Sequence, residues 1–234
     1  MIAKIRFKKF NKDWKKFVFN AGIHIIYGES GVGKSSLLDA FQGKRLKDSL
    51  NFGMKISLDP AVKVYRIFHN PDHQIIASTV SNEITFAGEC KQLDPQQLKE
   101  TLDRNLKYLP DHIDPMMNPG YLSGGEKELL NLVTALDFNP DILLVDDGLS
   151  FLSDENKEHC LKIMEDWTER SGGIIIWVTS DIEDLRYEGN SLVLSLDSFS
   201  THIPGSKIRY EDVHLPKGNM SLDIDNLNFG YMGQ

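Results

Sequence analysis

The sequence contains little cysteine and has no long apolar run. Its two cysteines, Cys90 and Cys160, lie far apart without metal-ligand spacing, and no secretory signal accompanies them. This pattern predicts a protein of the reducing cytoplasm. The longest apolar runs, at residues 142–145 and 174–178, have the length of buried strands and are far shorter than the roughly 20 residues of a membrane-spanning helix. The sequence therefore predicts no membrane span.

Positive charge is also scarce. The 234 residues include 26 Lys and Arg against 34 Asp and Glu, which gives a net charge of −8. Nonspecific binding to nucleic acid depends on Lys and Arg that neutralise phosphates, so we expect no nucleic-acid partner. Basic residues do gather at positions 4–16, where a solvated hairpin edge is favoured over a binding face. The length suits one α/β domain and little more.

A phosphate-binding loop is the first pattern with chemical content. An apolar strand at residues 22–27 leads into Gly-Glu-Ser-Gly-Val-Gly-Lys-Ser at 28–35, and helical spacing follows. Backbone N–H groups of such a loop, at the positive end of a helix, bind phosphate oxygens, although an ordinary Gly/Ser turn is the alternative. Lys34 would bridge the β- and γ-phosphates, and Ser35 would bind Mg²⁺. The predicted nucleotide-binding residues are Gly28, Glu29, Ser30, Gly31, Val32, Gly33, Lys34, Ser35 and Ser36.

An apolar strand that ends in two acids supplies the expected partner of this loop. Residues 140–147 read Pro-Asp-Ile-Leu-Leu-Val-Asp-Asp. Ligands collect at the carboxyl ends of parallel strands, so Asp146 is expected to face the Mg²⁺ held by Ser35. Taken alone, the pattern fits a simple strand-to-loop transition equally well. Ser35 and Asp146 are therefore the predicted metal ligands.

The segment that indicates a family lies between these two patterns. Residues 121–126 read Tyr-Leu-Ser-Gly-Gly-Glu and precede a predicted helix at 127–136. In this order, the three patterns resemble those of ABC ATPases, whose signature motif is Leu-Ser-Gly-Gly-(Gln/Glu); a plain helix N-cap is the alternative. The N–H groups at such a helix start can bind a phosphate. The residues that match the signature are Leu122, Ser123, Gly124, Gly125 and Glu126.

The resemblance implies an α/β fold with a phosphate-loop NTPase core. Its sheet would be mixed and mainly parallel, with an N-terminal antiparallel β subdomain and a helical subdomain inserted at about 72–128, within a domain of residues 1–203. It also implies ATP and Mg²⁺ as cofactors, and a head-to-tail dimer in which each signature meets the partner's nucleotide. Residues 68–88 resemble the energy-coupling-factor and cobalt or nickel importer branch. The chain would then act on the cytoplasmic face of the membrane with transmembrane subunits; a regulatory or scaffold ABC ATPase is the alternative.

Three positions that carry hydrolysis in this family differ here. The resemblance places His69 where Gln is usual, Asp147 where Glu is usual and Ser180 where His is usual. Misplacing a general base by about 1 Å can cost roughly a hundredfold in rate. We therefore expect slow hydrolysis at this chain's own site, unless neighbouring residues compensate. The intact signature can still complete a partner's site, which favours a heterodimer or a tandem second ABC domain over a homodimer.

The two ends of the sequence carry the remaining predictions. Residues 220–234 resemble the opening of a second ABC domain after a linker or tail at 204–219, although a plain C-terminal strand is the alternative. Near the amino terminus, Phe10 or Trp14 could stack on adenine, since a surface aromatic offers a flat apolar face. Either ring could equally well only pack within a hairpin.

Overall fold

Two sheets form the framework of the domain. The computed structural model describes residues 3–9, 15–44, 52–59, 61–187, 190–194 and 199–200, which all belong to one compact unit, Met1–Ile203. The smaller sheet is antiparallel, in the order β2 (Lys15–Phe19), β1 (Ala3–Lys9) and β4 (Phe52–Ser57). The larger sheet has the order β5 (Val64–Ile67), β6 (Ile142–Asp146), β7 (Ile174–Thr179), β3 (Gly22–Tyr27), β8 (Asn190–Leu194) and β9 (Phe199–Ser200).

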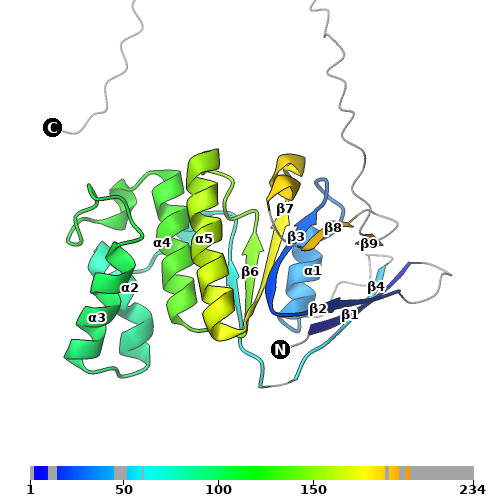
Figure 1. Ribbon diagram of the computed structural model, residues 1–234, viewed down its shortest axis with the longest axis horizontal. Coiled ribbons are helices and arrows are strands. Elements are labelled where there is room, and N and C mark those ends of the chain that lie inside the picture. The colour runs from blue at the N-terminus through cyan, green and yellow to red at the C-terminus, as the bar shows by residue number, and fades with distance from the viewer. Residues whose placement is uncertain are drawn as a thin grey trace, which may run out of the picture. The chain divides into compact units, whose positions relative to one another are not determined.

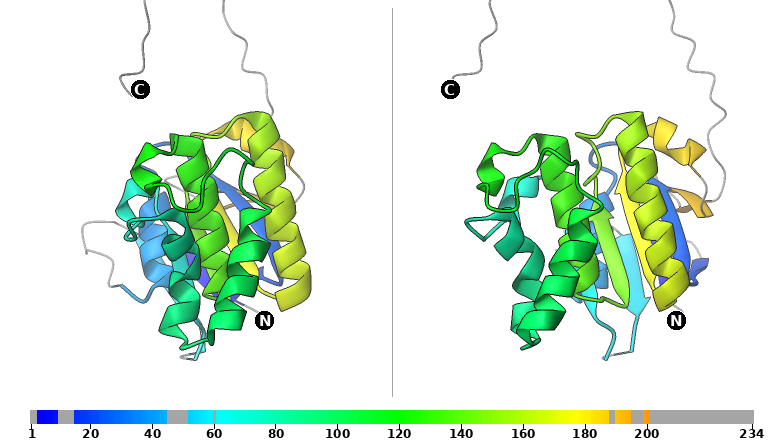
Figure 2. Two further views of the ribbon diagram at one scale, coloured as in Figure 1. Left: turned by 90° about the vertical axis from the view of Figure 1, so that its left-hand side faces the viewer. Right: turned by 60° about the vertical axis from the view of Figure 1, so that its left-hand side comes forward.

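Helices cover both faces of the larger sheet. Figure 1 shows α1 on one side of this sheet and α4 and α5 on the other, with α2 and α3 on the far side of α4 from the strands. The left view in Figure 2 faces this side of the domain and shows the helices in front of the strands. Among the described helices, none is long and apolar enough to cross a bilayer. The helices are α1 (Lys34–Phe41), α2 (Val80–Cys90), α3 (Pro95–Leu106), α4 (Gly124–Asp137) and α5 (Asp154–Ser171), with short 3₁₀ turns η1 (Pro71–His73), η2 (Pro119–Tyr121) and η3 (Ile182–Arg186).

The continuous apolar runs of the sequence are the central strands of this sheet. Successive side chains of a strand point to opposite faces. In β6, Ile142 and Leu144 belong to the core cluster that contains the apolar residues of α1, whereas Leu143 and Val145 belong to the cluster that contains those of α4 and α5. A parallel sheet covered on both faces therefore needs apolar residues at every position.

The predicted α/β architecture, with its mainly parallel sheet, is confirmed. Strands β5, β6, β7, β3 and β8 pair in parallel, and β9 pairs antiparallel to β8. The predicted amino-terminal hairpin is β1 and β2, to which β4 adds a third strand that the sequence did not predict. Phe10, Trp14 and residues 204–234 lie outside the described residues.

The parallel strands bring four polar segments to one edge of the sheet. Strand β3 ends before the loop at 28–33, β5 before His69, β6 at Asp146, and β7 before Ser180. The register places Tyr27 of β3 opposite Thr179 of β7, and Asp146 opposite Val178. The carboxyl edge of the sheet is thus where the predicted site residues gather.

Candidate functional site

The loop between β3 and α1 has the conformation of an anion cradle. Gly31 and Gly33 have φ angles of 84° and 103°, which side chains rarely adopt. A Cβ atom on Gly28 would lie 2.8 Å from Val32 Cγ2. No described side chain caps the N-terminus of α1, where Gly33 is the N-cap residue. The first N–H groups of α1 therefore remain available to an anion.

Lys34 places its ammonium group over this loop. The side chain is buried, and Nζ donates to the carbonyl oxygens of Gly28, at 2.7 Å, and Glu29, at 3.2 Å. A lysine has three such donors, so one remains beyond these two bonds. Phosphate oxygens would form stronger, charge-assisted bonds than the two carbonyls do. Gly28 to Ser36 thus form one continuous loop and helix start around a single cation.

The acid at the end of β6 has a partner that the sequence analysis did not include. Asp146 Oδ2 accepts a hydrogen bond from Nη2 of Arg66 on β5, while Nη1 of Arg66 donates to Asp39 Oδ1 of α1 at 2.7 Å. The Arg66 and Asp146 side chains are only 6% and 11% exposed. The guanidinium also lies 5.2 Å from the ring centre of Phe68.

This pairing bears on the expected metal site. Mg²⁺ prefers anionic oxygen ligands and is repelled by a neighbouring cation. The Ser35 hydroxyl is exposed, but Asp146 is already neutralised by Arg66. Among the described residues, no three His, Cys, Asp or Glu side chains form a metal-binding group. Because Arg66 already occupies this carboxylate, the donor set does not fit a metal ion held by Asp146.

The three predicted hydrolytic positions lie together. The Asp147 carboxylate accepts hydrogen bonds from the Ser180 backbone N at 2.7 Å and from Ser180 Oγ at 3.0 Å. His69 Nδ1 lies 3.5 Å from the Asp147 carbonyl oxygen. All three residues line one cavity of about 410 Å³. Both carboxylate oxygens of Asp147 are thus bonded to Ser180, the residue that the resemblance aligns with the usual His.

The signature segment begins helix α4 at the protein surface. Ser123 Oγ accepts from Glu126 N at 3.3 Å, and Glu126 Oε2 accepts from Ser123 N at 2.7 Å, which forms a capping box. The helix starts at Gly124, three residues earlier than predicted. Tyr121 and Phe151 are 83% and 58% exposed beside it. Ser123 is exposed, and Gly124 and Gly125 are half-buried, so a second molecule could reach this helix start.

Phe151 connects the signature helix to the loop after β5. A Cβ atom on Gly124 would lie 3.2 Å from Phe151 Cγ, so the ring packs directly on the helix start. On its other side, the ring stacks on His69, with centroids 6.1 Å apart. The backbone N of Phe151 donates to the buried Glu128 carboxylate of α4 at 3.1 Å. One aromatic residue thus joins the signature and the hydrolytic cavity.

Glu128 makes the stability of this junction pH-dependent. Burial raises the pKa of Glu128 to about 7, so the folded protein holds this proton more tightly than the unfolded chain. The protonated Glu128 side chain therefore contributes to the unfolding free energy. This contribution is fully present below the ordinary carboxyl pKa and is lost as the pH rises through 7. Between these limits, the unfolding free energy of the wild type should fall by up to about 3 kcal/mol relative to Glu128→Gln. Denaturant unfolding of both proteins at pH 5 and pH 8.5 measures this; an equal difference at both pH values would contradict it.

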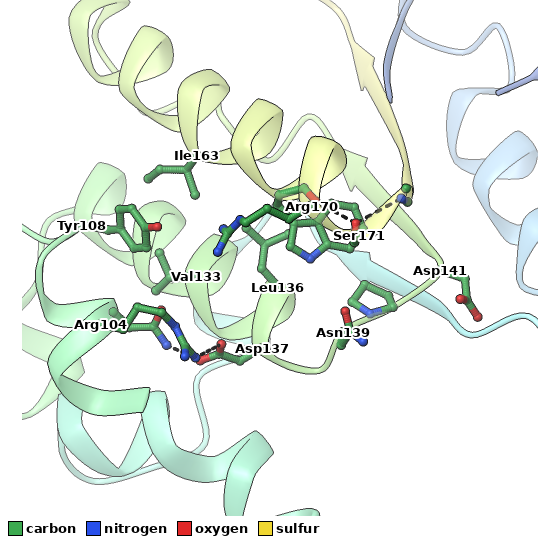
Figure 3. Close-up of a pocket in the computed structure, with 15 residues that line it drawn as sticks. Arg104, Tyr108, Val133, Leu136, Asp137, Asn139, Asp141, Ile163, Arg170 and Ser171 are labelled. Carbon is green, nitrogen blue, oxygen red and sulfur yellow. Dashed lines mark hydrogen bonds and ion pairs between the residues drawn. The ribbon is translucent and has the colours of Figure 1, made fainter. Parts of the chain in front are cut away.

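A second cavity lies away from these motifs. It has a volume of about 480 Å³ and is lined by residues of α3, α4 and α5 and by the segments before β6 and β7 (Figure 3). Arg104 and Asp137 form an ion pair of 2.9 Å at its wall. Because it opens at the amino ends of β6 and β7, it lies at the opposite edge of the sheet from the phosphate loop.

Two contacts near the site were missed by the sequence analysis. Arg66 interrupts an otherwise apolar strand, and a charge in such a position predicts a buried partner. Lys157 of α5 is buried and donates to Asp184 at 2.8 Å, and Asp184 accepts from Thr179 Oγ1 at 2.6 Å. Burial opposes protonation of Lys157, but the bond to Asp184 raises its pKa on balance. This network fixes η3 against the end of β7, beside the hydrolytic cavity.

Comparison with known proteins identifies the family. The family model described as ABC transporter matches residues 16–150, more than half of the chain. The chain belongs to the ABC transporter family. This confirms the resemblance, and with it an ATPase that binds ATP.

Similar ABC proteins agree with the branch predicted from residues 68–88. The energy-coupling factor transporter ATP-binding protein EcfA1 of Streptococcus thermophilus is 26% identical over 208 residues, which cover 82% of this chain and 75% of that protein. EcfA1 of Mycoplasma capricolum is 29% identical over 187 residues, covering 76% of this chain and 46% of that protein. CbiO1 of Clostridium perfringens, part of the ABC transporter complex CbiONQ, shares the fold, with a TM-score of 0.68, 20% identity, and coverage of 84% of this chain and 88% of that one.

Proposed function

We propose that this chain is the ATP-binding subunit of an energy-coupling-factor type of ABC transporter. The observation that carries the proposal is the cradle of Gly28 to Ser36, closed by the buried Lys34 ammonium. The start of α4 supports a second role, because a helix N-terminus beside the exposed Ser123 suits the nucleotide of a partner. The chain would work on the cytoplasmic face of the membrane and act on transmembrane subunits. Any Mg²⁺ would rest on Ser35 and the phosphates rather than on Asp146.

Slow hydrolysis at this chain's own site is the second part of the proposal. A general base must reach its water within about 3 Å, and Asp147 is one methylene shorter than the usual Glu. Its two carboxylate oxygens are engaged by Ser180. The Ser180 hydroxyl cannot extend as far as an imidazole, and it carries no positive charge toward the γ-phosphate.

Because the hydrolytic residues are altered while the signature is intact, we expect a partner subunit that hydrolyses ATP. The capping box of Ser123 and Glu126 is intact, so the signature can complete a site on another subunit. That subunit would be an ABC ATPase with Glu and His at the positions of Asp147 and Ser180, either as a separate chain or as a tandem domain. The pair would hold two ATP molecules, one hydrolysed quickly and one slowly.

Restoring the usual side chains tests the slow-site proposal. The double substitution Asp147→Glu with Ser180→His should raise, by at least about tenfold, the ATP turnover of a mixed pair whose partner lacks its own phosphate-loop lysine, since a positioned general base contributes roughly 100-fold or more. The partner then supplies only its signature, so the site of this chain is the one measured. Phosphate release by the wild type and the double variant measures this.

Two controls make this experiment decisive. Lys34→Ala added to the double variant should abolish the gain, because the activity would depend on the same phosphate loop. Brisk turnover by the wild type, or no gain in a folded double variant that still binds ATP, would refute slow hydrolysis at this site.

A further inference from the structure

Arg66 binds the carboxylate that was predicted to hold the metal ion. Its guanidinium bridges Asp146, at the end of β6, and Asp39 of α1. Asp39 follows Ser35 by four residues in the same helix, so the two side chains share one face, one turn apart. The two hydrogen bonds of Arg66 thereby link Asp146 to α1, the helix that carries Ser35. The cation thus holds the carboxylate that was expected to face Mg²⁺.

The charges around Arg66 disfavour a second cation. The guanidinium is 6% exposed and pairs with Asp146, which is 11% exposed. Its second carboxylate, Asp39, also has Lys44 at 3.3 Å, so the two cations balance the two acids. Opposite charges attract strongly in such poorly solvated surroundings. A divalent cation at Asp146 would have to displace Arg66 or tolerate it as a close neighbour. Either event weakens metal binding.

The bonding of Arg66 also differs from that of a fully satisfied salt bridge. Its buried Nε has no hydrogen-bond partner among the described residues. Buried donors are nearly always paired, and an unpaired one costs stability. Arg66 Nη1 and Nη2 each make one hydrogen bond, so this cost falls on the Nε–H group. The Arg66 guanidinium stays paired with Asp146 despite the cost of this unpaired N–H group.

We propose that Arg66 replaces the divalent cation at Asp146, so that this chain binds ATP with little dependence on Mg²⁺. The inference rests on the proposed ATP-binding function and adds the electrostatic means of binding. Arg66 provides the positive charge that balances Asp146, and the Lys34 ammonium provides the positive charge at the triphosphate. The site then holds ATP as a stable, slowly hydrolysed ligand without a metal bound to Asp146.

Equilibrium binding with and without metal tests this. ATP affinity of the whole chain is measured by displacement of a fluorescent ATP analogue, in excess EDTA and in millimolar Mg²⁺. We expect the two affinities of the wild type to differ by less than about threefold, whereas a metal anchored by Asp146 would give a difference of about tenfold or more. The latter result would overturn the inference. No binding in either buffer would instead reject the proposed function.

Variants of Arg66 identify the source of the effect. Arg66→Met removes the charge and should raise the dependence on Mg²⁺ to about tenfold or more, because Asp146 becomes free to bind metal. Arg66→Lys, which keeps the charge, should remain close to the wild type. If Arg66→Met does not fold, Arg66→Met with Asp39→Asn removes one of the carboxylates left unpaired. Unchanged metal dependence in folded Arg66→Met or in this double variant would contradict the role of Arg66.

Discussion

Lys34→Ala should lower the affinity of the chain for ATP by about 100-fold. The buried ammonium is the one cation that the structure places directly over the phosphate loop among its described residues, bonded to the Gly28 and Glu29 carbonyls. A hydrogen bond between charged groups contributes about 1.5–3 kcal/mol, and loss of the one remaining bond to phosphate, at the upper end of this range, corresponds to roughly 100-fold. Isothermal titration with ATP measures the change.

A matched surface lysine serves as the control for this experiment. Lys162 lies on α5 and is exposed, so Lys162→Ala removes the same charge away from the loop. Its ATP affinity should equal that of the wild type within about twofold, since exposed charges are largely screened. If Lys34→Ala kept its affinity while it remained folded, the assignment of the phosphate site would fail.

The parts of the fold set by local constraints were predictable. The positive φ angles of Gly31 and Gly33 are accessible mainly to glycine, so the loop is visible in the sequence as spaced glycines. Strands β6 and β7 were visible as continuous apolar runs, because both faces of the sheet are covered. The start of α4 was visible through the capping residue Ser123, although the helix begins earlier than its apolar spacing indicated.

Contacts between distant residues were not predictable in the same way. Arg66 and Asp146 are 80 residues apart, and only the parallel pairing of β5 with β6 brings them together. The sequence signal was one charge inside an apolar strand, without an indication of its partner. The meeting of Phe151, Gly124 and His69 likewise depends on three separate loops. Motifs therefore predicted the site, but not the charges that modify it.

Ser123→Asp should abolish ATP hydrolysis by a mixed pair of this chain and a fully equipped ABC partner. Asp caps a helix as well as Ser does, so α4 should remain folded from Gly124. The new carboxylate would face the partner's γ-phosphate and oppose the charge that develops there. Loss of one such stabilising group costs about 100-fold or more, and we expect a loss of at least this size. Ser123→Asn, a neutral cap of the same shape, should reduce the rate much less.

The central claim is that this chain's own site holds ATP while its signature completes a partner's site. The most direct test is the steady-state ATPase rate of three mixed pairs, in which this chain is wild type, Ser123→Asp or Lys34→Ala. We expect Ser123→Asp to lower the rate by about 100-fold or more and Lys34→Ala to lower it by less than about tenfold. The reverse pattern, in which Lys34→Ala abolishes hydrolysis and Ser123→Asp leaves it unchanged, would contradict the account.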